Sequence, residues 1–219
     1  MRNIIFRKGQ SIWLGFFIYD VLKNFKKLCE IKEDYEKIEE YELIQENLKK
    51  SLNQNGWDGK WYRRAYFEDE TPVGSSQNDE CKIDLISQSF SILSSVIDED
   101  KIESVIKSVE ENLVDNDLKI VKLLTPAFEK SKNNPGYIMD YPEGVRENGG
   151  QYTHSVAWYI MALIRAGYID RAYNYYQMIN PINRTLRKKD VEVYKVEPYV
   201  IAADIYSNKS NPSRGGWTW

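Results

Sequence analysis

Residues 134–154 read NPGYIMDYPEGVRENGGQYTH and lead directly into an apolar stretch that ends near residue 166. The segment holds six glycine or proline residues, three tyrosines and the only histidine of the chain, His154. Because glycine and proline interrupt regular structure, this composition predicts a long loop that ends where a buried helix begins. Long ordered loops in compact domains usually carry function.

On both sides of this loop, apolar helices are predicted to alternate with amphipathic ones. The stretches that are apolar around most of the helix are residues 10–29, 84–97, 151–166 and 197–206. The stretches with a single apolar stripe are residues 34–54, 100–114 and 169–179. A helix that is apolar on most sides is covered by neighbours, whereas a striped helix packs on one face. The alternation predicts an all-α fold of inner and outer helices, as in an α/α toroid, with about half of the ring present as three to four pairs. Asp84 is predicted to cap the helix that it starts.

The composition limits the class of function. A chain of 219 residues, of which 42% are hydrophobic and 29% charged, can bury one full core. The net charge of −3 argues against nucleic-acid binding, which needs clustered lysine and arginine. Two cysteines and one histidine argue against a disulfide framework and a His/Cys metal site. A reducing cytoplasm is the expected location.

The apolar run at residues 12–22 is predicted to be a buried helix rather than a signal peptide or a membrane span. It contains Asp20 and continues into a lysine-rich stretch at residues 23–27, with no small-residue cleavage site. We therefore expect no membrane partner.

The long loop carries the groups that recognise a sugar and an anion. Arg146 beside Glu147, followed by Gln151, supplies paired donors and acceptors for hydroxyl groups, and the tyrosines supply flat faces for the C–H side of a sugar ring. His154 is expected at the N-terminus of the next helix, where an anion is favoured. The alternative for His154 is a hydrogen-bonded histidine of the core.

Two further segments offer candidate site residues. Residues 57–67, WDGKWYRRAYF, offer Trp61 and Arg63 as a wall of a saccharide site. The alternative is that they cap helix ends and pair with neighbouring carboxylates. Lys195 and Glu197, in YKVEPYV at residues 194–200, lie just before or at the start of the last predicted inner helix, with Pro198 in its first turn; a simple ion pair is the alternative.

Several motifs, in order along the chain, resemble glycoside hydrolase family 94. This family includes cellobiose and chitobiose phosphorylases and the phosphorylase-like domain of cyclic β-1,2-glucan synthases. The matching stretches are WDGKWYRRAYF, ECKID with QS three residues later, LLTPAF, NPGYIMDYPEGVRENGGQYTH, NPINR, YKVEPYV and RGGWTW. The resemblance covers essentially the whole chain.

The resemblance implies an (α/α)6 barrel and inverting phosphorolysis of a β-linked disaccharide or oligosaccharide, with inorganic phosphate as co-substrate and no cofactor. It assigns His154 to phosphate. It assigns Arg146, Glu147, Lys195 and Glu197 to polar positions around the sugar, and the stretch with Trp61 and Arg63 to a cleft wall. No catalytic residue and no metal ligand is assigned within the chain, because the general-acid aspartate of the family lies in a D-W-N-D motif expected upstream of Met1.

We therefore expect residues 1–219 to be a partial catalytic domain that is inactive by itself. One alternative is a carbohydrate-binding or accessory module. Another is half of a split enzyme that a separate chain, the missing N-terminal part, completes. A homo-oligomer is a further possible arrangement, since a divided toroid exposes apolar helix faces.

Overall fold

The computed structural model describes residues 9–197 and 199–218 and is rich in helix. Its α-helices are α1 (Ile12–Ile31), α2 (Tyr35–Asn55), α3 (Leu85–Leu93), α4 (Ile102–Asn112), α5 (Thr153–Arg165), α6 (Ile169–Ile179) and α7 (Lys188–Tyr194). Single turns of 3-10 helix occur at Glu99–Lys101 and Tyr137–Asp140. No helix in these ranges is both long and apolar enough to cross a membrane.

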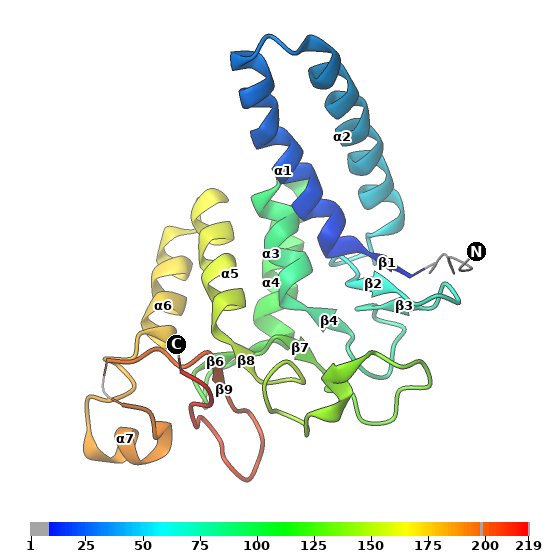
Figure 1. Ribbon diagram of the computed structural model, residues 1–219. Coiled ribbons are helices and arrows are strands. Elements are labelled where there is room, and N and C mark those ends of the chain that lie inside the picture. Colours follow the sequence, from blue (N-terminus) through cyan, green and yellow to red (C-terminus); the bar gives the residue numbers. More distant parts are fainter. Residues whose placement is uncertain (1–8, 198, 219) are drawn as a thin grey trace, which may run out of the picture.

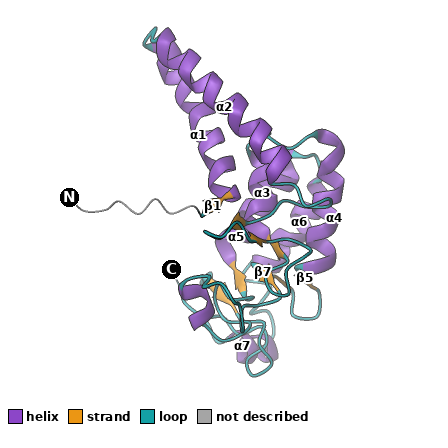
Figure 2. Cartoon of the chain, turned by 90° about the vertical axis from the view of Figure 1, so that its right-hand side faces the viewer, coloured by secondary structure: helices purple, strands orange, loops and turns teal. Residues whose placement is uncertain are grey.

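The helices form three consecutive pairs. α1 packs on α2, α3 on α4 and α5 on α6, while α1, α3 and α5 also pack on one another in that order. The hairpin of α1 and α2 projects beyond the other helices (Figures 1 and 2). The predicted alternation of inner and outer helices is therefore confirmed for these three pairs, and their arrangement as about half of a toroid stays a prediction.

Side-chain caps explain where three of the helices begin. Ser11 Oγ accepts a hydrogen bond from Leu14 N at 3.2 Å, and an Asp34 carboxylate oxygen accepts one from Lys37 N at 3.2 Å. Asp84 Oδ1 accepts from Ser87 N at 3.0 Å, which confirms the predicted cap. Each such cap is worth about 1 kcal/mol, because it satisfies an N–H group that the helix leaves unpaired.

The main core lies between the three inner helices. Its fully buried side chains include Phe16 of α1, Leu85 of α3 and Tyr159 of α5, and burial of each large apolar side chain stabilises the fold by roughly 1.5–3 kcal/mol. Gln88 is also fully buried; it bonds the main chain of Tyr62 through both its amide oxygen and its amide nitrogen, at 2.8 Å each. This pair of bonds fastens the loop after α2 to α3.

Short two-residue strands gather at one end of the helices (Figure 1). They are β1 (Gln10–Ser11), β2 (Ala65–Tyr66), β3 (Pro72–Val73), β4 (Ile83–Asp84), β5 (Val114–Asp115), β6 (Ile120–Val121), β7 (Leu124–Thr125), β8 (Gln151–Tyr152) and β9 (Asp204–Ile205). All pairings are antiparallel: β1–β2–β3, β4–β7, β5–β6 and β8–β9. Because β4 continues into α3 and β8 into α5, the N-termini of both inner helices lie at this end.

The prediction of a fourth inner helix at residues 197–206 is wrong. The described residues there form turns and β9, which pairs Tyr152 with Asp204, and a short helix that was not predicted, α7, precedes them. Lys195 and Tyr199 have left-handed backbone angles, φ 53° and 69°, which no continuing helix tolerates. Pro198, expected in the first turn of that helix, and Trp219 lie outside the described residues.

Candidate functional site

The site lies where the long loop meets β8, β9 and the first turn of α5. Asn148 fixes the loop from inside: its amide nitrogen donates to Phe128 O and Tyr141 O, and its amide oxygen accepts from Phe128 N, at 2.7 to 2.8 Å. Gly144 has φ 75°, and a Cβ there would lie 2.5 Å from Asn208 N. Only glycine fits this position, so the loop is held close to the segment after β9.

Arg146 is held between two aromatic rings. Its guanidinium carbon lies 5.1 Å from the ring centre of Tyr141 and 4.8 Å from that of Trp217, distances at which a cation is attracted to the ring face. Its Nε lies 3.7 Å from Glu147 Oε2. Neither of these two buried atoms has a hydrogen-bond partner among the described residues.

Glu147 lies next to the Arg146 guanidinium group. The hydroxyl group of Tyr137 lies 3.5 Å from Glu147 Oε1, and the glutamate side chain is 16% exposed. A carboxylate and a guanidinium with unused hydrogen-bonding atoms, bordered by tyrosine and tryptophan rings, can recognise the hydroxyl groups and the apolar face of a sugar. The structure thus brings Arg146 and Glu147 together as the sequence predicted.

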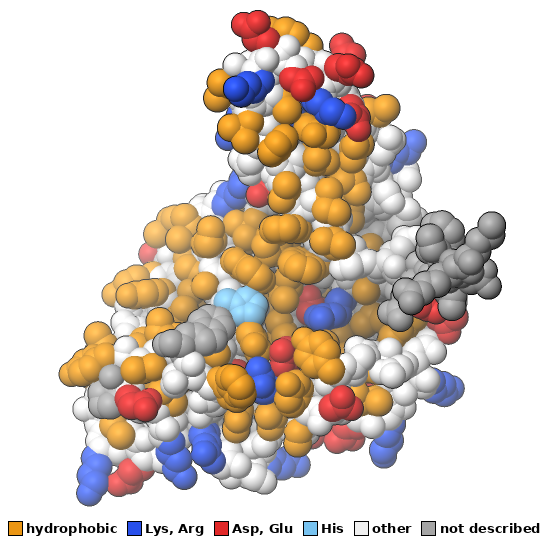
Figure 3. Space-filling view, in the orientation of Figure 1, with side chains coloured by type: hydrophobic (Ala, Val, Ile, Leu, Met, Phe, Trp, Pro, Cys, Tyr) orange, Lys and Arg blue, Asp and Glu red, His pale blue; other side chains and the backbone are white. Residues whose placement is uncertain are grey.

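His154 lies beside them in the first turn of α5. Its ring packs edge-on against Tyr152 at 4.6 Å and Trp158 at 4.8 Å, but the residue is only half-buried. Burial lowers the pKa of His154, and the charge of Glu147 acts in the opposite direction. In Figure 3 the histidine is visible among apolar side chains, with basic and acidic side chains below it and to its right. A neutral imidazole carries one N–H group.

Asp204 was not singled out in the sequence, yet it belongs to this cluster. It is 1% exposed; Oδ1 accepts a hydrogen bond from Trp217 N at 2.9 Å, and Oδ2 has no partner among the described residues. Burial raises the pKa of Asp204, whereas the bond from Trp217 N and the charge of Arg146 lower it. The signal was an aspartate inside an apolar run, VIAADIY, since buried carboxylates are rare without a role.

We expect Asp204→Asn to leave stability unchanged near pH 3 and to increase it near pH 8. A carboxyl group whose pKa is raised by folding costs no stability below its ordinary pKa; the cost grows as the pH rises from the ordinary to the folded pKa and is constant above it. An asparagine has no charge to bury. Urea unfolding at the two pH values measures the difference, and a gap that shrinks with rising pH contradicts the assignment.

Gln151 does not face the site. It is fully buried, its amide oxygen accepts from Val121 N at 3.0 Å, and its amide nitrogen lies 3.4 Å from Thr153 Oγ1. In this position it has no surface to offer a sugar. It ties β6 to β8, so a direct sugar contact is not retained.

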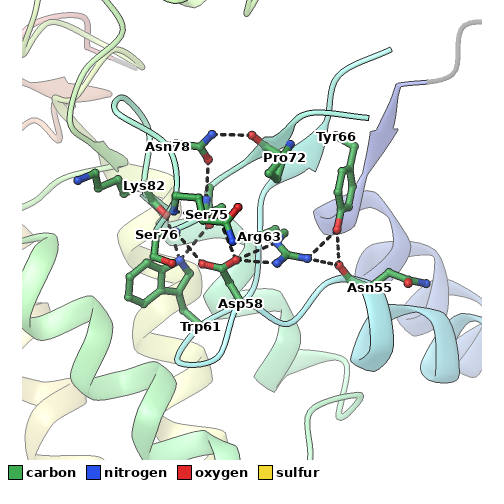
Figure 4. Close-up of polar contacts among 12 residues, drawn as sticks. Asn55, Asp58, Trp61, Arg63, Tyr66, Pro72, Ser75, Ser76, Asn78 and Lys82 are labelled. Carbon is green, nitrogen blue, oxygen red and sulfur yellow. Dashed lines mark hydrogen bonds and ion pairs between the residues drawn. The ribbon is translucent and has the colours of Figure 1, made fainter. Parts of the chain in front are cut away.

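Trp61 and Arg63 belong to a separate polar cluster that fastens the loop after α2 (Figure 4). Trp61 Nε1 donates to Gly74 O and Lys82 O, while Arg63 bonds Asp58 at 2.8 Å and donates to the hydroxyl group of Tyr66. These bonds favour the structural alternative for both residues.

The carboxylate of this cluster is held in its charged form. Burial acts to raise the pKa of Asp58, but hydrogen bonds from Ser76, Ser75 and Arg63 outweigh it and lower the pKa. The next arginine, Arg64, pairs with the buried carboxylate of Asp84 at the start of α3.

Lys195 and Glu197 lie in the connection between α7 and β9. Both side chains are exposed, and Lys195 ends α7. No hydrogen bond or ion pair from either side chain to the described residues places them in the site. Among those residues, no group of three or more His, Cys, Asp or Glu side chains has a metal-binding arrangement.

Residues 3–219 match the model of one protein family, described as the glycosyl hydrolase 94 superfamily, catalytic domain. The chain is 44% identical, over 97% of its length, to a cyclic beta-(1,2)-glucan synthase, NdvB, of Rhizobium meliloti, of which it covers 8%. It is 26% identical, over 87% of its length, to an N,N'-diacetylchitobiose phosphorylase of Vibrio furnissii, covering 24% of it. A solabiose phosphorylase of Paenibacillus borealis is 27% identical over 95% of the chain, which covers 26% of that protein.

Proposed function

The chain belongs to the glycosyl hydrolase 94 superfamily, as part of its catalytic domain, and from that premise we propose that it supplies sugar-binding and phosphate-binding groups to an inverting phosphorylase. The substrate class is a β-linked glucoside, and inorganic phosphate is the co-substrate. The chain spans only 8% to 26% of the three relatives described above, so the activity belongs to a larger catalytic unit.

The observation that carries the proposal is the meeting of Arg146, Glu147 and His154 at one end of the helices. Arg146 and Glu147 lie 3.7 Å apart under exposed aromatic rings, which suits a sugar. His154 lies at the N-terminus of α5, where backbone N–H groups and the helix dipole favour an anion. A sugar and a phosphate bound side by side are the two reactants of phosphorolysis.

In the proposed reaction, an oxygen of phosphate attacks the anomeric carbon from the face opposite the leaving sugar. The bond to the leaving oxygen breaks, and a carboxylic acid gives that oxygen a proton, so the product is a sugar 1-phosphate of inverted configuration. His154 holds phosphate through an N–H group, and Glu147 accepts hydrogen bonds from sugar hydroxyls. We assign the proton donor to a part of the catalytic unit outside these 219 residues.

We further infer that the linkage is β-1,2. The support is the 44% identity to a cyclic beta-(1,2)-glucan synthase, against 26% and 27% to the two phosphorylases described above. Identity of this extent over nearly the whole chain favours a shared sugar-binding arrangement.

The exposed apolar face of the inner helices supports completion by further helices. On α1 it consists of Leu14, Phe17, Ile18, Val21, Phe25 and Leu28, which are 39% to 54% exposed. Apolar side chains run from the projecting hairpin to the middle of the molecule, where the histidine lies (Figure 3). An apolar patch of this kind marks a surface that another part covers. This favours a partial catalytic unit, or half of a split enzyme, over a free-standing accessory module.

The test is phosphorolysis by the complete protein that carries this domain. With sophorose, a β-1,2-linked disaccharide, and phosphate, we expect release of α-glucose 1-phosphate, detected by ³¹P nuclear magnetic resonance. We expect cellobiose, which is β-1,4-linked, to react at least about tenfold more slowly, since one well-placed polar contact is worth that factor. Release of free glucose without phosphate consumption contradicts the proposal.

A further inference from the structure

The segment at residues 215–218 is held against the site by a carboxyl group that has no part in the proposed reaction. We propose that Asp204 is a positioning residue: its carboxylate fixes the backbone of residues 215–218 and, through it, the indole of Trp217 over the Arg146 guanidinium. This role rests on the proposed function, because it concerns the sugar-binding position of Arg146.

Residues 215–218 run alongside β9 as an added strand. Trp217 O accepts from Ala203 N at 2.5 Å, Asp204 O accepts from Gly216 N at 2.8 Å, and bridges pair Ile205 with Gly215 and Ala202 with Thr218. β9 in turn pairs with β8, which ends immediately before α5 and His154. The added strand is thus connected to the site through two neighbouring strands.

The carboxyl group of Asp204 is packed directly on this strand. Oδ1 accepts from Trp217 N at 2.9 Å, and a Cβ at position 216 would lie 2.5 Å from both carboxyl oxygens. Glycine at 216 is therefore what allows the carboxyl group to reach the next N–H group. Any side chain at that position displaces the carboxyl group from Trp217 N.

Trp217 depends on its backbone for its position. Its side chain is 64% exposed, so little burial holds the indole, yet the ring lies 4.8 Å from the guanidinium carbon of Arg146. Tyr141 covers the same guanidinium at 5.1 Å. Loss of one of the two rings frees Arg146 to leave the position in which it lies 3.7 Å from Glu147.

A buried carboxylate is a costly way to hold one N–H group, because an amide oxygen accepts the same bond without a charge. If Asp204 acts only as an acceptor for Trp217 N, asparagine replaces it and alanine does not. This gives the experiment its matched pair, Asp204→Asn against Asp204→Ala. Gly216→Ala is a second way to break the same bond with Asp204 intact.

The experiment uses the complete protein and two measurements that do not need turnover. Hydrogen exchange of the peptide containing residues 211–219, followed by mass spectrometry, reports the bond to Trp217 N. Calorimetric titration with sophorose reports sugar binding. For Asp204→Ala and Gly216→Ala we expect exchange at least about tenfold faster and sophorose binding about five- to tenfold weaker, consistent with loss of one hydrogen bond. For Asp204→Asn we expect the exchange rate and the sophorose affinity to stay within about twofold of those of the unsubstituted protein.

Trp217→Ala separates positioning from general destabilisation. If Asp204 acts through this ring, the double variant Asp204→Ala, Trp217→Ala binds sophorose no more weakly than either single variant. If the losses of sophorose affinity in the two single variants multiply in the double variant, the proposal is overturned. Unchanged sophorose binding in Asp204→Ala overturns it as well. So does an Asp204→Asn variant that binds sophorose as weakly as Asp204→Ala. If the unsubstituted protein binds no sophorose, the proposed function fails; slow exchange that Asp204→Ala does not accelerate overturns the positioning role separately.

Discussion

His154→Ala in the complete protein is expected to raise the phosphate concentration for half-maximal phosphorolysis by about 10- to 100-fold. A hydrogen bond to a charged group is worth about 1.5–3 kcal/mol, and every 1.4 kcal/mol is a factor of ten. Burial lowers the pKa of His154, so near pH 7 it donates as a neutral imidazole. Initial rates at varied phosphate and saturating sophorose measure the effect.

Two comparisons make this result specific to phosphate. Met161 lies on the same helix and is 55% exposed, so Met161→Ala is a matched control that should leave phosphate use unchanged. Sophorose affinity should stay within about threefold in His154→Ala, because Arg146 and Glu147 are untouched. Equal loss of phosphate and sugar binding refutes the assignment and favours a histidine that only packs against Trp158.

The periodic parts of the fold could be predicted from the sequence. The single stripe of residues 169–179 and the cap at Asp84 depend only on residues near in sequence, and both predictions agree with α6 and α3. The prediction for residues 197–206 failed because their structure depends on residues that are distant in the sequence. They are apolar enough for a helix, but Tyr152 and Ile205 belong to strands joined by hydrogen bonds between segments about fifty residues apart, which no local pattern reveals.

The candidate site could be predicted only where its residues stand together in one loop. Arg146, Glu147 and His154 stand in one glycine-rich segment, so a single loop brings them together. Arg63 stands in a segment of the same composition, yet its donors are used by Asp58 and Tyr66. The composition of a segment shows which groups can bind a ligand. Only the folded structure shows whether those groups already bond a neighbouring residue.

The 219 residues expressed by themselves are expected to show no phosphorolysis, at least about 10² to 10⁴ below the complete protein. That factor is the usual contribution of general acid catalysis. We expect neither carboxyl group of the candidate site to supply the acid, because Asp204 is 1% exposed and Glu147 Oε2 lies 3.7 Å from Arg146 Nε. Sugar 1-phosphate release is measured by ³¹P nuclear magnetic resonance after circular dichroism has established that the chain is helical.

The same preparation tests whether the apolar face of α1 belongs to an interface. We expect the isolated chain to self-associate, and Phe17→Ser with Val21→Ser, both on that face, to reduce association in sedimentation experiments. Tyr35→Ser, at the exposed tip of the hairpin, is the control and should leave self-association unchanged. Adding the remainder of the catalytic unit as a separate polypeptide should restore phosphorolysis, and the double serine variant should block the restoration. If instead the isolated chain releases sugar 1-phosphate, and Glu147→Gln abolishes this release, the proton donor lies within these 219 residues. The assignment of the proton donor to another part of the catalytic unit is then wrong.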